Sequence, residues 1–262
     1  MASSTSLVIS SAKLNGLKRY NLIAGLFHLI QAIAIIALSN DYALPVSVNY
    51  LQDAPIPGAK FESVHLFNLP IAYGVAIFSL LSALAHLWIV GPGFSKYAFN
   101  LSKKQNFMRW IEYALSSTLM IILISMINAV WDFVALLAVA GLNASMILFG
   151  WLQEKYEEPG KGSLQPFWFG CIAGVIPWIA MFWLLFSPGS SMEAPGFVYG
   201  IVISLFLFFN SFALVQWLQY KEIGRWKDYL VGERTYITLS FIAKSALAWQ
   251  IFAGVLATSS LQ

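Results

Sequence analysis

Seven long apolar stretches, separated by polar links, constrain the fold of this chain more than any other feature. They cover residues 20–39, 65–90, 107–129, 131–153, 168–186, 197–219 and 234–258. In a helix, about 20 mainly apolar residues cross the hydrocarbon core of a bilayer. Hydrophobic residues make up 59% of the chain, charged residues 10%, and the mean hydropathy is +0.71. We therefore predict an all-α, multi-pass membrane protein, a seven-transmembrane helix bundle, with one domain over residues 1–262.

The positions of Lys and Arg predict the orientation of this bundle. Thirteen of the 15 lie at the N-terminus or in and beside the links after the second, fourth and sixth stretches. The other two are Lys60, in the first link, and Lys244, within the last stretch. Because cytoplasmic loops are enriched in Lys and Arg, we expect a cytoplasmic N-terminus and an extracellular C-terminus in the cell membrane. Residues 1–11 lack the basic region and cleavage site of a signal peptide, so the first stretch is expected to serve as an uncleaved insertion signal.

The first link, residues 40–64, is the longest and differs from the others. Apolar and polar residues alternate from Pro45 to Leu51, and Pro55, Pro57 and Gly58 follow. This pattern predicts a short strand or hairpin on the extracellular face.

Lys244 lies near the middle of the last apolar stretch. It follows Arg234, at the polar border, by ten residues, which places it about 15 Å into the membrane at the rise of a helix. A lone ammonium at that depth costs at least about 2.5–3.5 kcal/mol. Two interpretations follow: a structural ion pair, or a Schiff base between the lysine amine and a carbonyl cofactor.

Glu112 has two interpretations, an interfacial acid that stays hydrated or the partner of Lys244, and we expect the second. It lies one turn inside the inner end of the third stretch, three residues after Arg109, and apart from Asp132, at the border of the fourth stretch, it is the only acid within the predicted helices. Ser240 precedes Lys244 by one turn, and Ser116 follows Glu112 by one turn. Both hydroxyls are therefore placed to help hydrogen-bond a charged nitrogen.

Two histidines, His28 and His86, fall in the same inner half, with Gln31 and Ser82 one turn away. Packing alone would explain either histidine. Together these polar groups indicate a hydrated pocket on the inner side of Lys244, because burying them dry and without a function would be costly. The outer half has few polar side chains, and the middle layer is aromatic, which suits a flat apolar polyene.

Seven helices with a lysine at the middle of the seventh resemble a retinal-binding rhodopsin. The cytoplasmic N-terminus, opposite to that of the usual microbial and animal rhodopsins, is similar to the heliorhodopsins. The matching motifs are Asn106-x-x-Arg109-Trp110-x-Glu112-Tyr113 with Ser116, His28-x-x-Gln31, Ser82-x-x-x-His86, and Ser240-x-x-x-Lys244 with Trp249. The resemblance covers the whole helical core.

This resemblance implies all-trans retinal bound to Lys244 as a protonated Schiff base, with Glu112 as counterion and Ser240 assisting. The other residues expected to line the chromophore are Ser116, Asn143, Met146, Ile147, Phe209 and Trp249. The residues expected in the adjoining polar cavity are His28, Gln31, Ser82, His86, Asn106, Arg109 and Trp110. The resemblance further implies a homodimer, a small sheet in the first extracellular link, and a sensory photoreceptor that is no enzyme. A cytoplasmic signalling partner is possible, and no nucleic acid is expected.

Two other functions remain to be weighed. A seven-helix membrane zinc hydrolase also uses a pair like Ser82 and His86, but a catalytic zinc needs about three protein ligands. The last stretch has no His, and His65 is predicted near the outer end of the second helix, far from His86. A light-driven pump needs acids on both sides of the Schiff base, and Ser240 and Leu123 occupy positions where an acid would serve. Passive light-gated conduction is less firmly excluded.

Overall fold

The computed structural model describes residues 7–256, and within them seven helices are long and apolar enough to cross a membrane. They are α1 (Ser11–Leu38), α2 (Ile71–Val90), α4 (Phe107–Ile127), α5 (Phe133–Tyr156), α6 (Gln165–Phe186), α7 (Gly196–Tyr220) and α8 (Tyr229–Ile251), which continues as the π turn η2 (Phe252–Leu256). Each spanning helix packs on the next, and α8 also packs on α1, which closes the bundle. The predicted seven-helix fold is confirmed.

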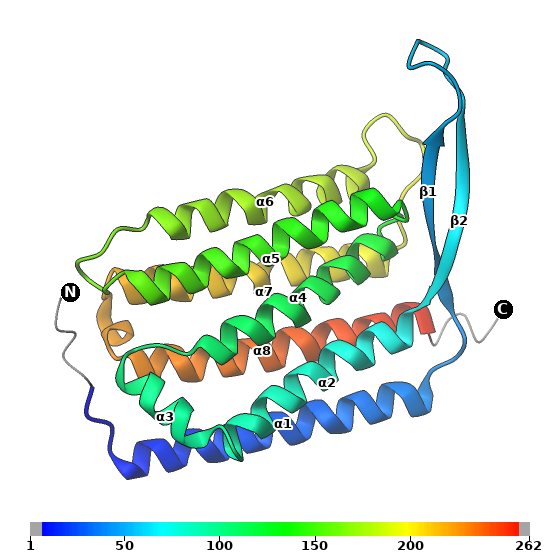
Figure 1. The fold of residues 1–262 in the computed structure, drawn as a ribbon. Helices are drawn as coiled ribbons and strands as arrows, with labels where there is room; N and C mark the ends of the chain where they lie inside the picture. Colours follow the sequence, from blue (N-terminus) through cyan, green and yellow to red (C-terminus); the bar gives the residue numbers. More distant parts are fainter. Residues whose placement is uncertain (1–6, 257–262) are drawn as a thin grey trace.

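The bundle has two distinct ends (Figure 1). We call the end where α1 begins the N-terminal face; it also carries the short helix α3 (Phe94–Ser102) and the 3-10 turn η1 (Gly224–Lys227). The opposite end, the sheet face, carries β1 (Ala43–Leu51) and β2 (Phe61–Pro70). The helix α3 was not predicted, because its nine residues are too few and too polar to register as an apolar stretch.

Side-chain caps determine where several helices begin. Ser10 accepts a hydrogen bond from the Lys13 amide at 3.4 Å, Asn106 one from Arg109 at 3.2 Å, and Asp132 one from Ala135 at 2.9 Å. Asp228 likewise accepts from the Leu230 amide at 2.9 Å. Such caps satisfy amides that have no partner inside the helix.

Several predicted limits are wrong. The cap at Ser10 starts α1 at Ser11, not at residue 20, and the cap at Asp228 starts α8 at Tyr229, not at residue 234. At its far end, α5 continues to Tyr156, not 153. Charged residues near a membrane border weaken the apolar pattern without ending the helix. The predicted end of the last stretch at residue 258, and the first six residues of the chain, lie outside the described residues.

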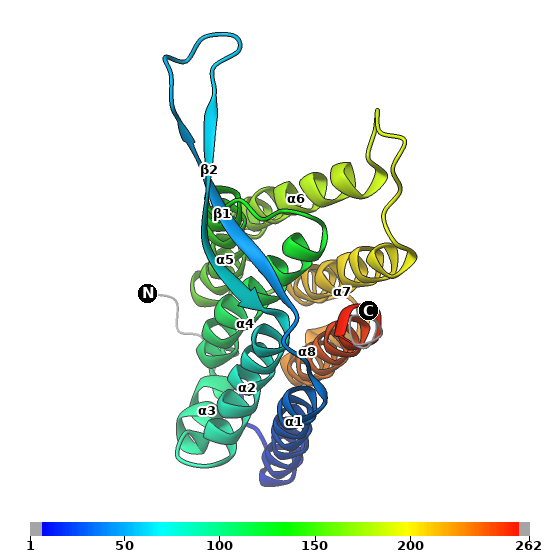
Figure 2. The ribbon, with the colours of Figure 1, turned by 90° about the vertical axis from the view of Figure 1, so that its right-hand side faces the viewer.

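The predicted strand or hairpin is confirmed as an antiparallel pair, β1 with β2, with a bulge between Val46 and Ser47. It lies across the helix ends at the sheet face and projects beyond the bundle (Figure 2). Residues 65–70, predicted as the start of the second helix, belong to β2 instead, so His65 lies in a strand. The reason is Pro70, which caps α2 and disfavours helical backbone in the residue before it.

The apolar core and the buried polar residues occupy different halves of the bundle. The largest apolar cluster gathers side chains from α2, α4, α6, α7 and α8, including Phe78, Met120, Trp178, Leu205 and Leu247. Most of the buried polar and charged side chains instead lie toward the N-terminal face. Large apolar side chains such as Ile33 and Trp183 are more than 60% exposed on the outside of the helices, as expected where lipid covers them. The polar half therefore holds the candidate functional site.

Candidate functional site

Lys244 and Glu112 form a buried ion pair between α8 and α4. The Lys244 Nζ atom lies 2.7 Å from Glu112 Oε1, and the two residues are 3% and 7% exposed. Nζ also donates to Ser240 Oγ at 2.9 Å, and Ser82 Oγ donates to Glu112 Oε1 at 2.6 Å. A buried pair is tolerated when additional hydrogen bonds satisfy both ions, as they do here. The structure thus brings together the two charged groups that the sequence placed at one depth.

An apolar cavity of about 90 Å³ extends from Lys244 between α4, α5, α7 and α8. Its lining residues are Trp110, Tyr113, Ser116, Ser117, Met120, Met146, Ile147, Gly150, Phe209, Phe212, Ala213, Gln216, Tyr236, Ser240, Ala243 and Lys244. A second cavity of about 240 Å³, between α5, α6 and α7, shares Met146, Gly150, Phe209, Ala213 and Gln216 with the first. The first cavity, with the aromatic and aliphatic wall that it shares with the second, forms an apolar slot that ends on a buried amine, which fits an elongated apolar aldehyde.

Two of the residues predicted to line the chromophore lie elsewhere. The Trp249 side chain does not line this cavity, and the residue is 42% exposed. Five residues along a helix turn the side chain by roughly 140° relative to Lys244, so Trp249 faces away from this cavity. Asn143 is buried behind the wall, where its amide donates to Ser117 Oγ at 2.9 Å and Thr118 Oγ1 at 3.1 Å. The other residues predicted to line the chromophore, Ser116, Met146, Ile147 and Phe209, do line the cavity.

The two histidines lie against each other on the N-terminal side of the ion pair. The His28 and His86 rings are nearly parallel, with centroids 5.8 Å apart. His86 Nδ1 lies 2.8 Å from Asn21 Oδ1, whereas neither ring nitrogen of His28 has a hydrogen-bond partner among the described residues. Gln31 donates to Ser79 at 2.9 Å and so does not contact a histidine ring by hydrogen bond.

A small cavity of about 20 Å³ lies beside His86; its lining also includes Asn21, Asn106, Arg109, Glu112 and Glu233. That volume is enough for about one water molecule. Of the residues predicted in the polar cavity, His86, Asn106 and Arg109 line this one, whereas His28, Gln31, Ser82 and Trp110 do not.

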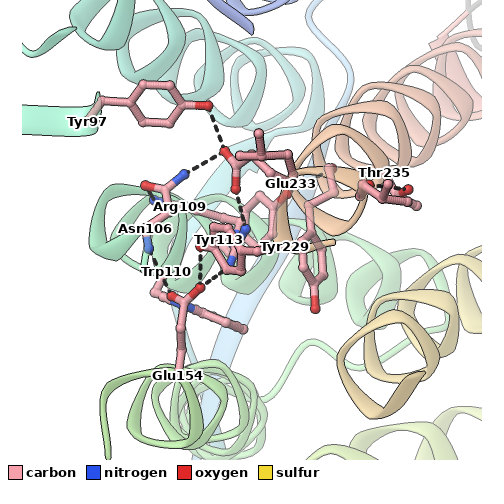
Figure 3. Close-up of polar contacts among 12 residues, drawn as sticks. Tyr97, Asn106, Arg109, Trp110, Tyr113, Glu154, Tyr229, Glu233 and Thr235 are labelled. Carbon is pink, nitrogen blue, oxygen red and sulfur yellow. Dashed lines mark hydrogen bonds and ion pairs between the residues drawn. The ribbon is translucent and has the colours of Figure 1, made fainter. Parts of the chain in front are cut away.

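A second charged group, which we call the ionic cluster, consists of Arg109, Glu154 and Glu233 (Figure 3). Arg109 Nη1 lies 2.5 Å from Glu233 Oε2, and Nη2 lies 2.6 Å from Glu154 Oε1. All three residues are less than 10% exposed. The guanidinium fork suits this arrangement, because it can bind two carboxylates at once.

Neutral donors complete the cluster. Asn106 Nδ2 and the Tyr97 hydroxyl each donate to Glu233 Oε1 at 2.9 Å. The Tyr229 hydroxyl donates to Glu154 Oε1 at 2.7 Å, and Trp110 Nε1 donates to Glu154 Oε2. Burial and the neighbouring Glu233 carboxylate raise the pKa of Tyr97, on α3, well above its usual range, so this hydroxyl remains a donor.

The ionic cluster corrects one prediction. Glu112 is not the only acid within the helices, because Glu154 lies in α5 and Glu233 in α8. Of the residues predicted in the polar cavity, Arg109 lines it and Trp110 does not, and both have their polar contacts in the cluster. The sequence signal that could have found it was the cap residue Asp228, which would have placed Glu233 inside the last helix.

Within the described residues, no group of three or more His, Cys, Asp or Glu could hold a metal ion. His65, which the zinc-site alternative considered, lies in β2 and contacts Asn68 Oδ1 at 2.9 Å.

Comparison with known proteins adds a family and a fold. A sequence model described as Heliorhodopsin matches residues 17–256. A search of curated proteins found no match. Among solved structures, the proton-pumping rhodopsin of the marine alga Acetabularia acetabulum is similar, with a TM-score of 0.63 and 14% identity over 94% of this chain and 96% of that one.

Two further solved structures show the same fold. The transmembrane domain of the Salpingoeca rosetta rhodopsin phosphodiesterase has a TM-score of 0.62 and 13% identity, over 93% of this chain and 84% of that one. Cyanorhodopsin from the cyanobacterium Tolypothrix has a TM-score of 0.59 and 11% identity, over 93% of this chain and 94% of that one. At these identities the likeness concerns the fold.

Proposed function

Because this chain belongs to the heliorhodopsin family, and is therefore a retinal-binding rhodopsin of the membrane, we propose that it is a light sensor in which Lys244 carries all-trans retinal as a protonated Schiff base. The observation that carries the proposal is the Lys244 amine, buried at the end of an apolar slot and 2.7 Å from the Glu112 carboxylate. A lysine in such a site is suited to form an imine with a carbonyl compound.

Retinal, when bound, supplies light absorption and isomerisation; the surrounding residues control charge and protons. Glu112 balances the positive nitrogen as counterion, because an ionised carboxylate close by favours the charged form. Ser240 Oγ accepts a hydrogen bond at that nitrogen, and Ser82 Oγ holds Glu112 from the other side. The remaining wall of the slot, largely apolar, excludes water.

The positions of the buried acids support sensing over pumping. Among the described residues, the buried acids are Glu112, Glu154 and Glu233, and the last two lie between the ion pair and the N-terminal face. Toward the sheet face, the buried polar side chains are neutral, such as Ser125 and Asn128. A proton that leaves the Lys244 nitrogen therefore has acceptors on one side, Glu112 and then the cavity around His28 and His86. Illumination then moves a proton internally and resets it without a vectorial step.

Transport measurements on the retinal-loaded protein test this role. Cells or vesicles carrying the protein are illuminated, and the pH change is recorded with and without a protonophore, alongside photocurrents under voltage clamp. We expect no sustained pH shift and no stationary current at zero voltage in symmetric solutions. A protonophore-sensitive shift or a stationary current would make the protein a pump. A current that appears only under an applied voltage would make it a light-gated channel.

The proposed sensor has a defined orientation in the membrane and assembles as a homodimer. The excess of Lys and Arg near the N-terminal face supports a cytoplasmic position for that face, where the link between α7 and α8 would meet a signalling partner. The sheet hairpin exposes apolar side chains, among them Phe61 at 66% and Phe67 at 48%. We propose that it pairs with a second copy in a homodimer, in which the protein acts as a receptor and not as an enzyme.

A further inference from the structure

We propose that Asn21, on α1, is a positioning residue that fixes the tautomer of His86, with the proton on Nδ1 and the lone pair on Nε2. The inference deepens the proposed function and rests on it in one respect, namely the use of the histidine cavity as a proton acceptor. The tautomer itself is a property of the protein in the dark.

The orientation of the Asn21 amide follows from its backbone contact. One terminal atom of the amide lies 2.9 Å from the carbonyl oxygen of Leu17, one turn earlier in α1. A carbonyl oxygen only accepts hydrogen bonds, so the atom facing it must be the donor Nδ2. The other terminal atom, 2.8 Å from His86 Nδ1, is therefore the acceptor Oδ1.

A second contact gives the same orientation independently. Glu233, already paired with Arg109, accepts a hydrogen bond from the Tyr97 hydroxyl at 2.9 Å. The Tyr97 proton is thus committed, and its oxygen is left to accept from Asn21 Nδ2 at 3.4 Å. These hydrogen bonds form a series, from His86 through Asn21 and Tyr97 to Glu233, in which each residue donates to the next.

The consequence for His86 is a defined tautomer. Because Asn21 Oδ1 can only accept, His86 Nδ1 must carry a proton, and in the neutral ring the lone pair is then on Nε2. Among the described residues, the only hydrogen-bond partner of the His86 ring is Asn21 Oδ1, and it contacts Nδ1. His86 lines the same small cavity as four other ionisable residues, Arg109, Glu112, Tyr113 and Glu233, and the His28 ring and Lys244 also lie nearby. His86 therefore offers the lone pair on Nε2, and not Nδ1, to a proton that enters this cavity.

The same amide does not itself relay a proton beyond His86. A side-chain amide holds hydrogen bonds but neither gains nor loses a proton at ordinary pH, so Asn21 does not pass protons from His86 to Tyr97 and Glu233. A proton taken up on Nε2 is retained in the cavity until it returns.

The test is nitrogen NMR of the retinal-loaded protein in the dark, with the histidine rings labelled with ¹⁵N. The His86 signals are assigned by their loss in His86→Gln. We expect the wild type to show a protonated, hydrogen-bonded Nδ1 and an unprotonated Nε2. In Asn21→Leu, which removes the acceptor, we expect loss of this pattern in favour of protonated Nε2.

Two variants serve as matched controls. Tyr97→Phe removes the hydroxyl but leaves the Asn21 amide held by Leu17, and Gln31→Leu removes an amide on the same helix that bonds to Ser79. Both should keep the wild-type His86 pattern. Protonated Nε2 in the dark wild type overturns the inference by itself, even if Asn21→Leu does not fold. So does an unchanged His86 pattern in a folded Asn21→Leu.

A light-driven measurement separates this inference from the proposed function. After a flash, we expect proton transfer away from the Lys244 nitrogen to slow in Asn21→Leu, on the order of 100-fold, the low end of what a positioned base contributes. If the dark spectra are as expected but the rate of proton transfer is unchanged in Asn21→Leu, the assigned His86 tautomer stands. The proposal that the histidine cavity accepts the proton would then be contradicted.

Discussion

At the scale of single residues, Lys244 and Glu112 compensate each other's charge, which allows both side chains to be buried. Removal of either partner leaves an uncompensated buried charge, which costs about 3–5 kcal/mol when a buried pair is broken. The hydrogen bonds from Lys244 to Ser240 and from Ser82 to Glu112 keep the pair in one geometry. The electrostatics of the chromophore site therefore depend on one carboxylate.

This dependence predicts the behaviour of Glu112→Gln. Without the ionised carboxylate the positive nitrogen loses its stabilisation, so the pigment should be a deprotonated, near-ultraviolet form at neutral pH, or a red-shifted one if an anion substitutes. Absorption spectra with and without chloride measure this. Glu154→Gln is the matched control, because Glu154 pairs with Arg109 and not with Lys244, and it should keep a visible band. A Glu112→Gln spectrum identical to wild type in both solutions would rule out Glu112 as counterion.

The ionic cluster makes a prediction about stability. Arg109→Leu leaves the Glu154 and Glu233 carboxylates buried without their cation, so it should cost about 3–5 kcal/mol and lower the temperature at which the pigment loses its colour. Lys13→Ala is the control: Lys13 pairs with Asp228 at 3.6 Å with both side chains more than 40% exposed. Exposed pairs contribute about 0–1 kcal/mol. If Arg109→Leu and Lys13→Ala lowered the temperature of colour loss equally, the ionic cluster would not be a main source of stability.

The residues show what the sequence could and could not predict. Lys244 and Glu112 were found because each lies well inside an apolar stretch, where helical rise converts position into depth. Glu154 and Glu233 were missed because each lies within a turn of a helix end, where composition cannot tell a wet link from a buried helix end. Arg109 was predicted in the polar cavity, and it lines that cavity, but its two carboxylate partners were not predicted.

At the scale of elements, close approach of α4 and α5 shapes the cavity wall. A methyl group on Gly150 would come within 2.6 Å of the Trp110 ring, which borders the cavity. Trp110 is also fixed by its bond to Glu154 and cannot easily move aside. The small side chain at position 150 thus sets the distance between the two helices.

Gly150→Ala should therefore impair pigment formation. The added methyl group pushes Trp110 into the slot or separates α5 from α4, and either change should shift the absorption band and lower the yield of pigment with retinal. The control is Gly141→Ala, also in α5, where a methyl group meets nothing within 4 Å and an alanine favours the helix by up to about 1 kcal/mol. Equal spectra and yields in the two variants would show that the α4–α5 contact does not shape the site.

Elements were predictable from sequence to different degrees. Long apolar helices were found because a membrane span needs a minimum length of apolar residues. The hairpin was found in part: the alternation in β1 was visible, but the apolar residues of β2 merged with α2 in the pattern. The helix α3 was not found, since its buried residues Tyr97 and Leu101 are too few to mark a helix on their own.

At the scale of the whole molecule, the proposed orientation can be measured directly. In a Cys171→Ala background, cysteines are introduced at Asp53, in the sheet hairpin link, and at Glu158, at the N-terminal face; both positions are exposed. With intact cells and a membrane-impermeant maleimide, Asp53→Cys should be labelled and Glu158→Cys only after lysis. The reverse pattern would place the N-terminal face outside and remove the basis for a cytoplasmic output.

The central claim is that retinal is bound covalently at Lys244, and the most direct test is to locate the adduct. Protein loaded with all-trans retinal is reduced with borohydride under illumination, digested, and analysed by mass spectrometry. We predict one retinyl-modified peptide, with the modification on Lys244, and neither colour nor adduct in Lys244→Ala. An adduct on another lysine, or a coloured Lys244→Ala with a normal adduct, would contradict the account.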